Sequence, residues 1–233
     1  MSISETVAAV RSEIAAAAQA AGRSPSDILL VAATKTQTAD EVRAAIAAGI
    51  TICGENRVQE LVKKAAQGAY AGASVHFIGH LQRNKVRQVV GQVDLIESVD
   101  SVPLLNAIEK QAAALGICQD ILLEVNIGRE PAKSGVFPEG LEELSCKASQ
   151  LPHIRLRGLM AIPPITTVPG ENRHFFRQMH QLFVDMRKKS YDNNDIHYLS
   201  MGMSGDFTDA IAEGANMVRI GAALFGPRMN RQI

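Results

Sequence analysis

Apolar and polar positions along this chain follow two patterns, one typical of strands and one typical of helices. Eight short runs rich in Val, Ile, Leu and Met are each bounded by polar or glycine-containing sequence, which predicts strands. The predicted strands cover residues 28–35, 50–55, 75–79, 95–100, 121–127, 154–162, 198–204 and 217–226. Between them, apolar residues recur at helical spacing over 39–49, 102–116 and 172–190. Gly49 and Gly116 stand where the first two of these helices should end.

Strands that alternate with helices predict parallel pairing, because a parallel neighbour is reached through a crossover connection. Eight strands, seven connections and a leading helix within residues 1–22 fit a (β/α)8 TIM barrel. We expect this α/β barrel to form a single domain over residues 1–233. A doubly wound open sheet is the alternative, but no G-x-G-x-x-G follows the first strand, so its usual dinucleotide-binding loop is missing.

The composition narrows the class of protein. Of the 233 residues, 46% are hydrophobic and 21% are charged, which suits a large core. Lys and Arg total 24, as do Asp and Glu, so the charge indicates neither a nucleic acid nor an anionic membrane as partner. The apolar runs are too short to span a bilayer, and the acidic first helix does not resemble a signal peptide. Three distant cysteines favour neither disulfides nor a zinc site and indicate a reducing, cytoplasmic location.

Residues of unusual chemistry gather at the carboxyl ends of the predicted strands, where a parallel barrel carries its functional site. Strand ends also meet solvent, so a polar residue there is weak evidence alone and stronger evidence as one of a set. The set consists of Lys35, Glu55, Asn56, Gly79, His80, Asp100, Asn126, Met160, Ser200, Ser204, Arg219 and Gly221.

The last two predicted strands carry features of an anion site. Ser204 precedes a helical segment and is predicted to be its N-cap, where free backbone N–H groups attract a negative charge. Arg219 supplies a fixed positive charge, and Gly221 lets the backbone approach a ligand closely. Barrels often bind phosphate between these two loops. Asp206 could instead cap the same helix, and Gly221 could simply be a core glycine.

Lys35 ends the first predicted strand, where partial desolvation should lower the pKa of its amine. A neutral amine can attack an aldehyde and form a Schiff base. With a phosphate site in the same barrel mouth, Lys35 favours either a pyridoxal phosphate site or a Schiff-base aldolase. Lys85 and Lys133 fall in loop or helix-start sequence, so each is a secondary ligand contact or, more simply, a solvated charge.

Seven segments in order along the chain carry a resemblance to a known family. They are VAATKT, GENRVQE, HFIGHLQRNK, EPAKSG, LRGLMAI, LSMGMSGDFTDAI and MVRIGAALFG. Together they resemble the pyridoxal phosphate homeostasis protein family over almost the whole chain. The resemblance implies a barrel similar to the N-terminal domain of alanine racemase, with pyridoxal 5′-phosphate (PLP) as the cofactor.

The resemblance also implies roles for individual residues. Lys35 matches the lysine that forms the internal aldimine, and Asn56 matches a residue beside the cofactor ring. Arg219 matches an arginine that faces the pyridine nitrogen, which would keep that nitrogen unprotonated and weaken the ring as an electron sink. The residues matching the phosphate cradle and its surroundings are Ser200, Ser204, Gly221 and Ala222.

Two positions depart from the family pattern. Ala222 stands where the family often has a threonine or serine hydroxyl, so one hydrogen bond to phosphate is lost while the backbone N–H remains. Arg57 stands where a tyrosine is common. Its side chain either reaches the site or, as we expect, lies on a helix surface.

Three functions fit these residues to different degrees. The first is a carrier that holds PLP on Lys35 for buffering or for delivery to PLP-dependent apoenzymes, without catalysis. The second is an amino-acid racemase, which needs a second acid/base that barrel racemases take from a further domain not recognised in this sequence. The third is the aldolase, with Glu55 and Asp100 as its carboxylates. We favour the carrier. Without the further domain, the usual racemase dimer contact is missing, so we also expect a monomer.

Overall fold

The computed structural model describes residues 2–189 and 194–226, and its centre is a closed barrel of eight parallel strands. Each strand pairs with the next in chain order, and β8 returns to pair with β1 through registers such as Val31 with Arg219. The strands are β1 (Leu29–Ala33), β2 (Ile52–Glu55), β3 (Ser74–Phe77), β4 (Leu95–Val99), β5 (Gln119–Val125), β6 (Ile154–Ala161), β7 (Asn194–Ser200) and β8 (Met217–Ile220). The predicted (β/α)8 barrel is confirmed.

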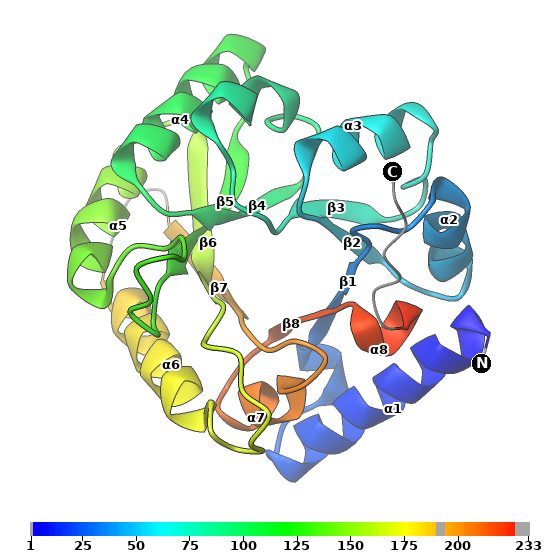
Figure 1. Ribbon diagram of the computed structural model, residues 1–233. Coiled ribbons are helices and arrows are strands. Elements are labelled where there is room, and N and C mark those ends of the chain that lie inside the picture. The colour runs from blue at the N-terminus through cyan, green and yellow to red at the C-terminus, as the bar shows by residue number, and fades with distance from the viewer. Residues whose placement is uncertain (1, 190–193, 227–233) are drawn as a thin grey trace.

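Helices surround the barrel as an outer ring (Figure 1). Helix α1 (Ile3–Ala20) precedes the first strand, as predicted, and starts with a capping box between Ser2 and Glu5. The remaining helices are α2 (Ala39–Ala47), α3 (Val58–Ala66), α4 (Val102–Leu115), α5 (Leu141–Ser149), α6 (Arg173–Arg187), α7 (Phe207–Ala212) and α8 (Ala222–Phe225). A 3-10 segment, Arg83–Gln88, connects β3 to β4, and two shorter ones cover Pro25–Asp27 and Pro138–Gly140. None of the described helices is long and apolar enough to cross a membrane.

The helix ends follow the sequence closely. Gly116 forms the C-cap of α4 with φ 64°, a left-handed conformation that glycine adopts without steric cost. Gly49 lies just beyond the end of α2 with φ 100°. The third predicted helix, 172–190, is observed as α6, and Ser190 lies outside the described residues.

The predicted ends of the last two strands are wrong. Strand β7 starts at Asn194 and stops at Ser200, because Gly202 turns the chain at φ 92° against α7, where a Cβ would lie 2.6 Å from the Cβ of Ala210. Strand β8 stops at Ile220, and the apolar residues that follow form the short helix α8. An apolar run alone could not separate strand from buried helix here.

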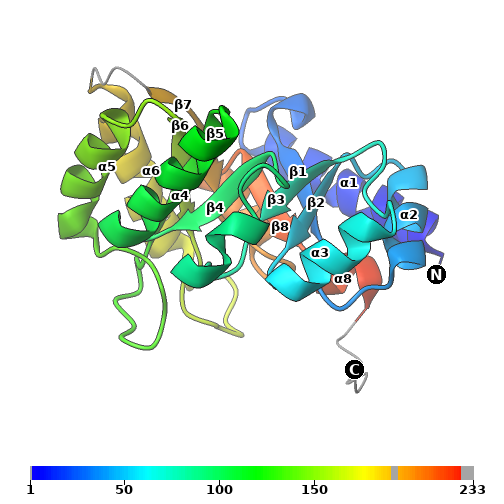
Figure 2. The same cartoon turned by 90° about the horizontal axis from the view of Figure 1, so that it is seen from above.

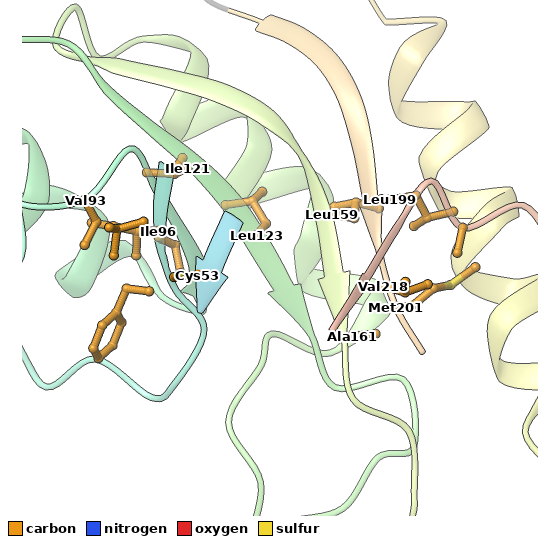
Figure 3. Packing of buried hydrophobic residues seen from close by; sticks show 14 of the residues in the cluster. Cys53, Val93, Ile96, Ile121, Leu123, Leu159, Ala161, Leu199, Met201 and Val218 are labelled. Atoms are coloured by element: carbon orange, nitrogen blue, oxygen red, sulfur yellow. The ribbon is translucent and has the colours of Figure 1, made fainter. Parts of the chain in front are cut away.

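Two apolar layers flank the strands. A large layer fills the space between barrel and helices, and Figure 3 shows part of it, including Cys53, Ile121 and Leu123. A smaller layer fills the barrel interior and includes Val31, Leu122 and Met217. Because side chains alternate along a strand, charged residues an even number of positions from these apolar ones also point toward the barrel axis. These are His76, Glu97, Glu124 and Arg219, all buried.

Candidate cofactor-binding site

A cavity of about 440 Å³ opens at the carboxyl ends of the strands. Figure 2 shows this side below the barrel, where the loops after β5 and β6 and helix α8 project. Six of the seven residues predicted to bind the cofactor line it: Lys35, Asn56, Ser204, Arg219, Gly221 and Ala222. Ser200, the seventh, is fully buried beneath the cavity and does not line it.

Lys35 lies two residues beyond the end of β1, in a turn. The turn is closed by a hydrogen bond from the Gln37 N–H to the Thr34 carbonyl at 3.1 Å. The lysine is half-buried, and its side chain belongs to the cavity wall together with Ala33 of the strand below. The strand was predicted to continue through Lys35, but its last residue is Ala33.

Asn56 reaches the cavity from the residue after β2. Its Oδ1 is buried and has no hydrogen-bond partner in the described structure, so a ligand could satisfy it. Gly79, two residues after β3, packs directly on this backbone, since a Cβ there would lie 2.2 Å from the Asn56 carbonyl oxygen. Arg57 is exposed and lies 3.6 Å from Glu60 on the surface of α3, as expected.

Ser204 and the start of α8 form one end of the cavity. The Ser204 Oγ accepts hydrogen bonds from the N–H groups of Gly221 at 3.3 Å and Ala223 at 3.2 Å. The predicted role of Ser204 as N-cap of the next helix is wrong: Ser204, Gly205 and Asp206 form a turn before α7, and Asp206 occupies the N-cap position. The Ser204 hydroxyl after β7 and the backbone N–H groups after β8 therefore lie together at this end of the cavity. They are joined by hydrogen bonds to each other and not by a helix N-cap at Ser204.

A buried network holds Arg219 inside the barrel. Its guanidinium donates to Ser200 Oγ and, at 2.9 Å, to the Ala161 carbonyl, while its Nη1 lies 3.8 Å from Glu97 Oε2. Ser200 donates to Glu97 Oε2 at 2.6 Å, and His76 Nδ1 lies 2.7 Å from Glu97 Oε1. Arg219 is therefore fixed in position from three sides while still lining the cavity.

The charges in this network balance one another. Burial lowers the pKa of Arg219, and the neighbouring Glu97 and Glu124 oppose that shift. Burial would raise the pKa of Glu97, but hydrogen bonds from His76 and Ser200 and the charges of His76 and Arg219 outweigh it, so the Glu97 pKa is lowered. A carboxylate is therefore maintained beneath the guanidinium.

Two acidic residues of the barrel interior, Glu97 and Glu124, were not predicted from the sequence. Each occupies the inward phase of a strand otherwise rich in apolar residues, and that alternation was the available signal. Glu124 lines the cavity, and Ser134 donates to its Oε1 at 2.9 Å. Burial raises the pKa of Glu124, partly opposed by that hydrogen bond, and its Oε2 has no described partner.

Several other predicted rim residues lie away from the cavity. Glu55 faces α3, where it binds Lys64 at 2.7 Å, and Asp100 lies near His80 outside the cavity wall. The side chain of Asn126 donates to the Glu130 carbonyl at 2.9 Å and so shapes the loop after β5. The carboxylate pair expected of an aldolase is therefore not assembled beside Lys35.

The two other lysines named from the sequence and the two described tyrosines lie outside the cavity wall. Lys133 pairs with Glu130 at 2.5 Å and donates to the Pro163 carbonyl at the edge of an adjoining groove, and Lys85 is half-buried on the segment Arg83–Gln88. Tyr70 donates to Glu55, and Tyr198 lies under the guanidinium of Arg157. Neither tyrosine lines the cavity. Tyr191 lies outside the described residues.

Comparison with known proteins agrees with this geometry. The model of the alanine racemase N-terminal domain family matches residues 6–229. The pyridoxal phosphate homeostasis protein of Aquifex aeolicus is 41% identical, with 98% of this chain and 99% of the relative covered. That of Pseudomonas aeruginosa is 42% identical, with 97% and 96% covered.

A solved structure extends the comparison to a bound ligand. PipY of Synechococcus elongatus, solved with PLP bound, is 34% identical with a TM-score of 0.81, and 96% of this chain and 100% of that chain are covered. The sequence identity, the matched length and the barrel fold of this chain therefore all point to the same family. The chain belongs to the pyridoxal phosphate homeostasis protein family, built on the alanine racemase N-terminal domain.

Proposed function

We propose that this protein holds PLP in the cavity at the strand ends through a covalent bond from Lys35 and thereby buffers or delivers the cofactor in the cell. The observation that carries the proposal is the convergence of Lys35, Arg219 and the Ser204–Gly221 donors on one cavity of about 440 Å³. PLP supplies an aldehyde that bonds reversibly to a primary amine, a pyridine ring and a phosphate.

The residues present fit these three parts of the cofactor. The phosphate would take hydrogen bonds from the Ser204 hydroxyl and the backbone N–H of Ala222, while the N–H groups of Gly221 and Ala223 hold the Ser204 oxygen in place. Ala222 offers no hydroxyl, so the phosphate depends more on Ser204. The unpartnered Oδ1 of Asn56 suits the polar edge of the ring.

Arg219 would face the ring nitrogen as a permanent donor, which leaves that nitrogen unprotonated. We assign Ser200 to a different role from the one first expected. Because it is buried between Arg219 and Glu97, it positions the guanidinium and does not touch the cofactor.

Absence of turnover is part of the proposal. Relatives named homeostasis proteins match this chain over nearly their full length. Neither described tyrosine that could offer a second acid/base lines the cavity. We further propose that the chain acts as a single-domain monomer in the cytoplasm, with PLP-dependent apoenzymes as recipients.

The test is to replace Lys35 by alanine. Purified protein is loaded with PLP, treated with borohydride and digested, and the modified peptide is identified by mass spectrometry. Wild type should show the absorbance of the covalent complex before borohydride is added and carry the reduced adduct on Lys35 afterwards. Lys35→Ala should lose both, whereas Lys85→Ala, whose lysine lies outside the cavity wall, should keep both.

An adduct that persists on another lysine in Lys35→Ala would contradict the assignment of Lys35. Turnover is tested separately by incubating loaded protein with L- or D-alanine, followed by chiral analysis. Sustained racemisation would refute the proposed carrier function.

A further inference from the structure

A second cluster of buried charge lies directly behind Lys35, on the outer side of the barrel. It consists of Glu55 at the end of β2, Glu60 and Lys64 on α3, and Tyr70 after that helix. None of the four lines the cavity. We call Glu55, Glu60 and Lys64 the α3 clamp.

The turn that carries Lys35 has an unfavourable conformation. Its third residue, Thr36, has φ 67°, one of two non-glycine residues with positive φ in the described chain. A turn of four residues with positive φ only at its third position has the pattern of a type II turn, which normally places glycine or asparagine there. A β-branched threonine in this position is strained and needs support from its surroundings.

Glu60 supplies that support on one side of Lys35. Its Oε2 accepts a hydrogen bond from the Thr36 N–H at 2.7 Å. Type I and type II turns differ by a flip of the central peptide, here the one between Lys35 and Thr36, which reverses the direction of this N–H. A carboxylate at that place therefore selects the type II form.

Lys64 supplies support on the other side. Its Nζ donates to the Thr34 carbonyl at 2.7 Å and to Glu55 Oε1 at 2.7 Å. Glu55 Oε1 also accepts from Thr34 Oγ1 at 2.6 Å and from the Tyr70 hydroxyl at 3.0 Å. Burial raises the pKa of Tyr70, and the adjacent Glu55 adds to the rise, so the tyrosine stays a hydrogen-bond donor.

These contacts fix the two peptide planes that meet at the Cα of Lys35. One plane contains the Thr34 carbonyl held by Lys64, and the other contains the Thr36 N–H held by Glu60. With both planes fixed, the direction of the Lys35 Cα–Cβ bond is fixed as well. Glu60 and Lys64 are one helical turn apart, 3.6 Å between Oε2 and Nζ, so a single helix holds both planes.

We propose that Glu60 and Lys64 are positioning residues that aim the Lys35 amine into the cavity, with Glu55 as the buried anion that holds Lys64. This inference rests on the proposed attachment of PLP to Lys35. It also explains the segment GENRVQE, in which only Asn56 has a place in the cavity: Glu55 and Glu60 act behind it.

The decisive experiment compares three changes at Glu60. Glu60→Ala removes the acceptor, Glu60→Asp keeps the charge but shortens its reach, and Glu60→Gln keeps the reach without the charge. If the hydrogen bond to Thr36 matters, alanine and aspartate should weaken PLP affinity by about fivefold, while glutamine should stay within about twofold of wild type. A role through charge alone predicts the reverse order for aspartate and glutamine and would overturn the proposal.

A measurement without cofactor separates this inference from the proposed function. In the protein without PLP, NMR hydrogen exchange of the Thr36 amide should be at least about fivefold faster in Glu60→Ala and Glu60→Asp, and unchanged in Glu60→Gln. Urea unfolding of the same variants records any general loss of stability, and Glu143→Ala on the exposed face of α5 serves as the control. Equal exchange rates in all variants would refute the clamp, whatever the borohydride experiment assigns to Lys35.

Discussion

Two buried clusters support the rim of this barrel, and they act on the site in different ways. The inner cluster, His76, Glu97, Ser200 and Arg219, lies within the strands, and its last member reaches the cavity directly. The α3 clamp lies between strands and helix and contacts the backbone on either side of Lys35. The inner cluster thus holds Arg219 through its side chain, whereas the α3 clamp acts on Lys35 through the neighbouring backbone.

This difference suits the chemistry that we propose for the two residues. A guanidinium that must remain charged beside a ring nitrogen can be bonded on several sides without losing its role. A lysine amine that must form and break a covalent bond needs its nitrogen accessible, so fixing the backbone positions it without occupying the amine.

The largest stability effect is expected inside the barrel. Glu97→Ala should leave Arg219 and His76 buried without the carboxylate that they share, and we expect a loss of about 3–5 kcal/mol in the free energy of unfolding. Urea denaturation followed by circular dichroism measures it, with Glu143→Ala as the exposed control. A loss below about 1 kcal/mol would show that Ser200 and the Ala161 carbonyl suffice to hold Arg219.

A smaller effect is expected in the α3 clamp. Lys64→Met should cost about 2–4 kcal/mol because Glu55 is left as a buried carboxylate with only two hydroxyl donors. The double variant Glu55→Gln/Lys64→Met should recover part of this loss, since it removes both charges. The neighbouring, exposed Lys63→Met is the matched control. Strictly additive losses would indicate that the two residues do not act as a pair.

The smallest effect is expected at Glu124, which belongs to neither cluster. Burial raises its pKa, so the folded state binds more protons than the unfolded state between the usual carboxyl range and the raised value. Wild-type stability should therefore fall as pH rises through that window, with a slope of at most about 1.4 kcal/mol per pH unit. Glu124→Gln should lack this contribution and gain on wild type as pH rises. Parallel stability curves for the two proteins would contradict the assignment.

Much of the fold follows from local patterns in the sequence. The alternation of apolar runs and helical segments predicts eight parallel strands. Gly116 marks a helix end because glycine, which has no Cβ, adopts the left-handed backbone conformation there without steric cost. The ends of β7 and β8 are less predictable. The apolar residues after Ile220 pack equally well as strand or helix, and only their contacts in the folded chain select α8.

The site shows the same division. Position at a strand end predicts Lys35, Asn56, Ser204, Arg219 and Gly221, and the family resemblance adds Ala222; all of them line the cavity. The same reasoning places Ser200 and Glu55 at the cavity, where they do not lie. Strand alternation tells which residues share a face, but it does not tell which face points to the barrel axis or what packs behind it.

The sequence by itself determines the strand and helix order, the family and the residues available for bonding to an aldehyde and a phosphate. Tertiary structure decides how those residues are held. Glu55 faces outward beside inward-facing Gly54, and it meets Lys64 and Tyr70 only because α3 packs on that side of the sheet. Side-chain identity is local information, whereas the partners of a buried charge depend on contacts between elements that the chain brings together only on folding.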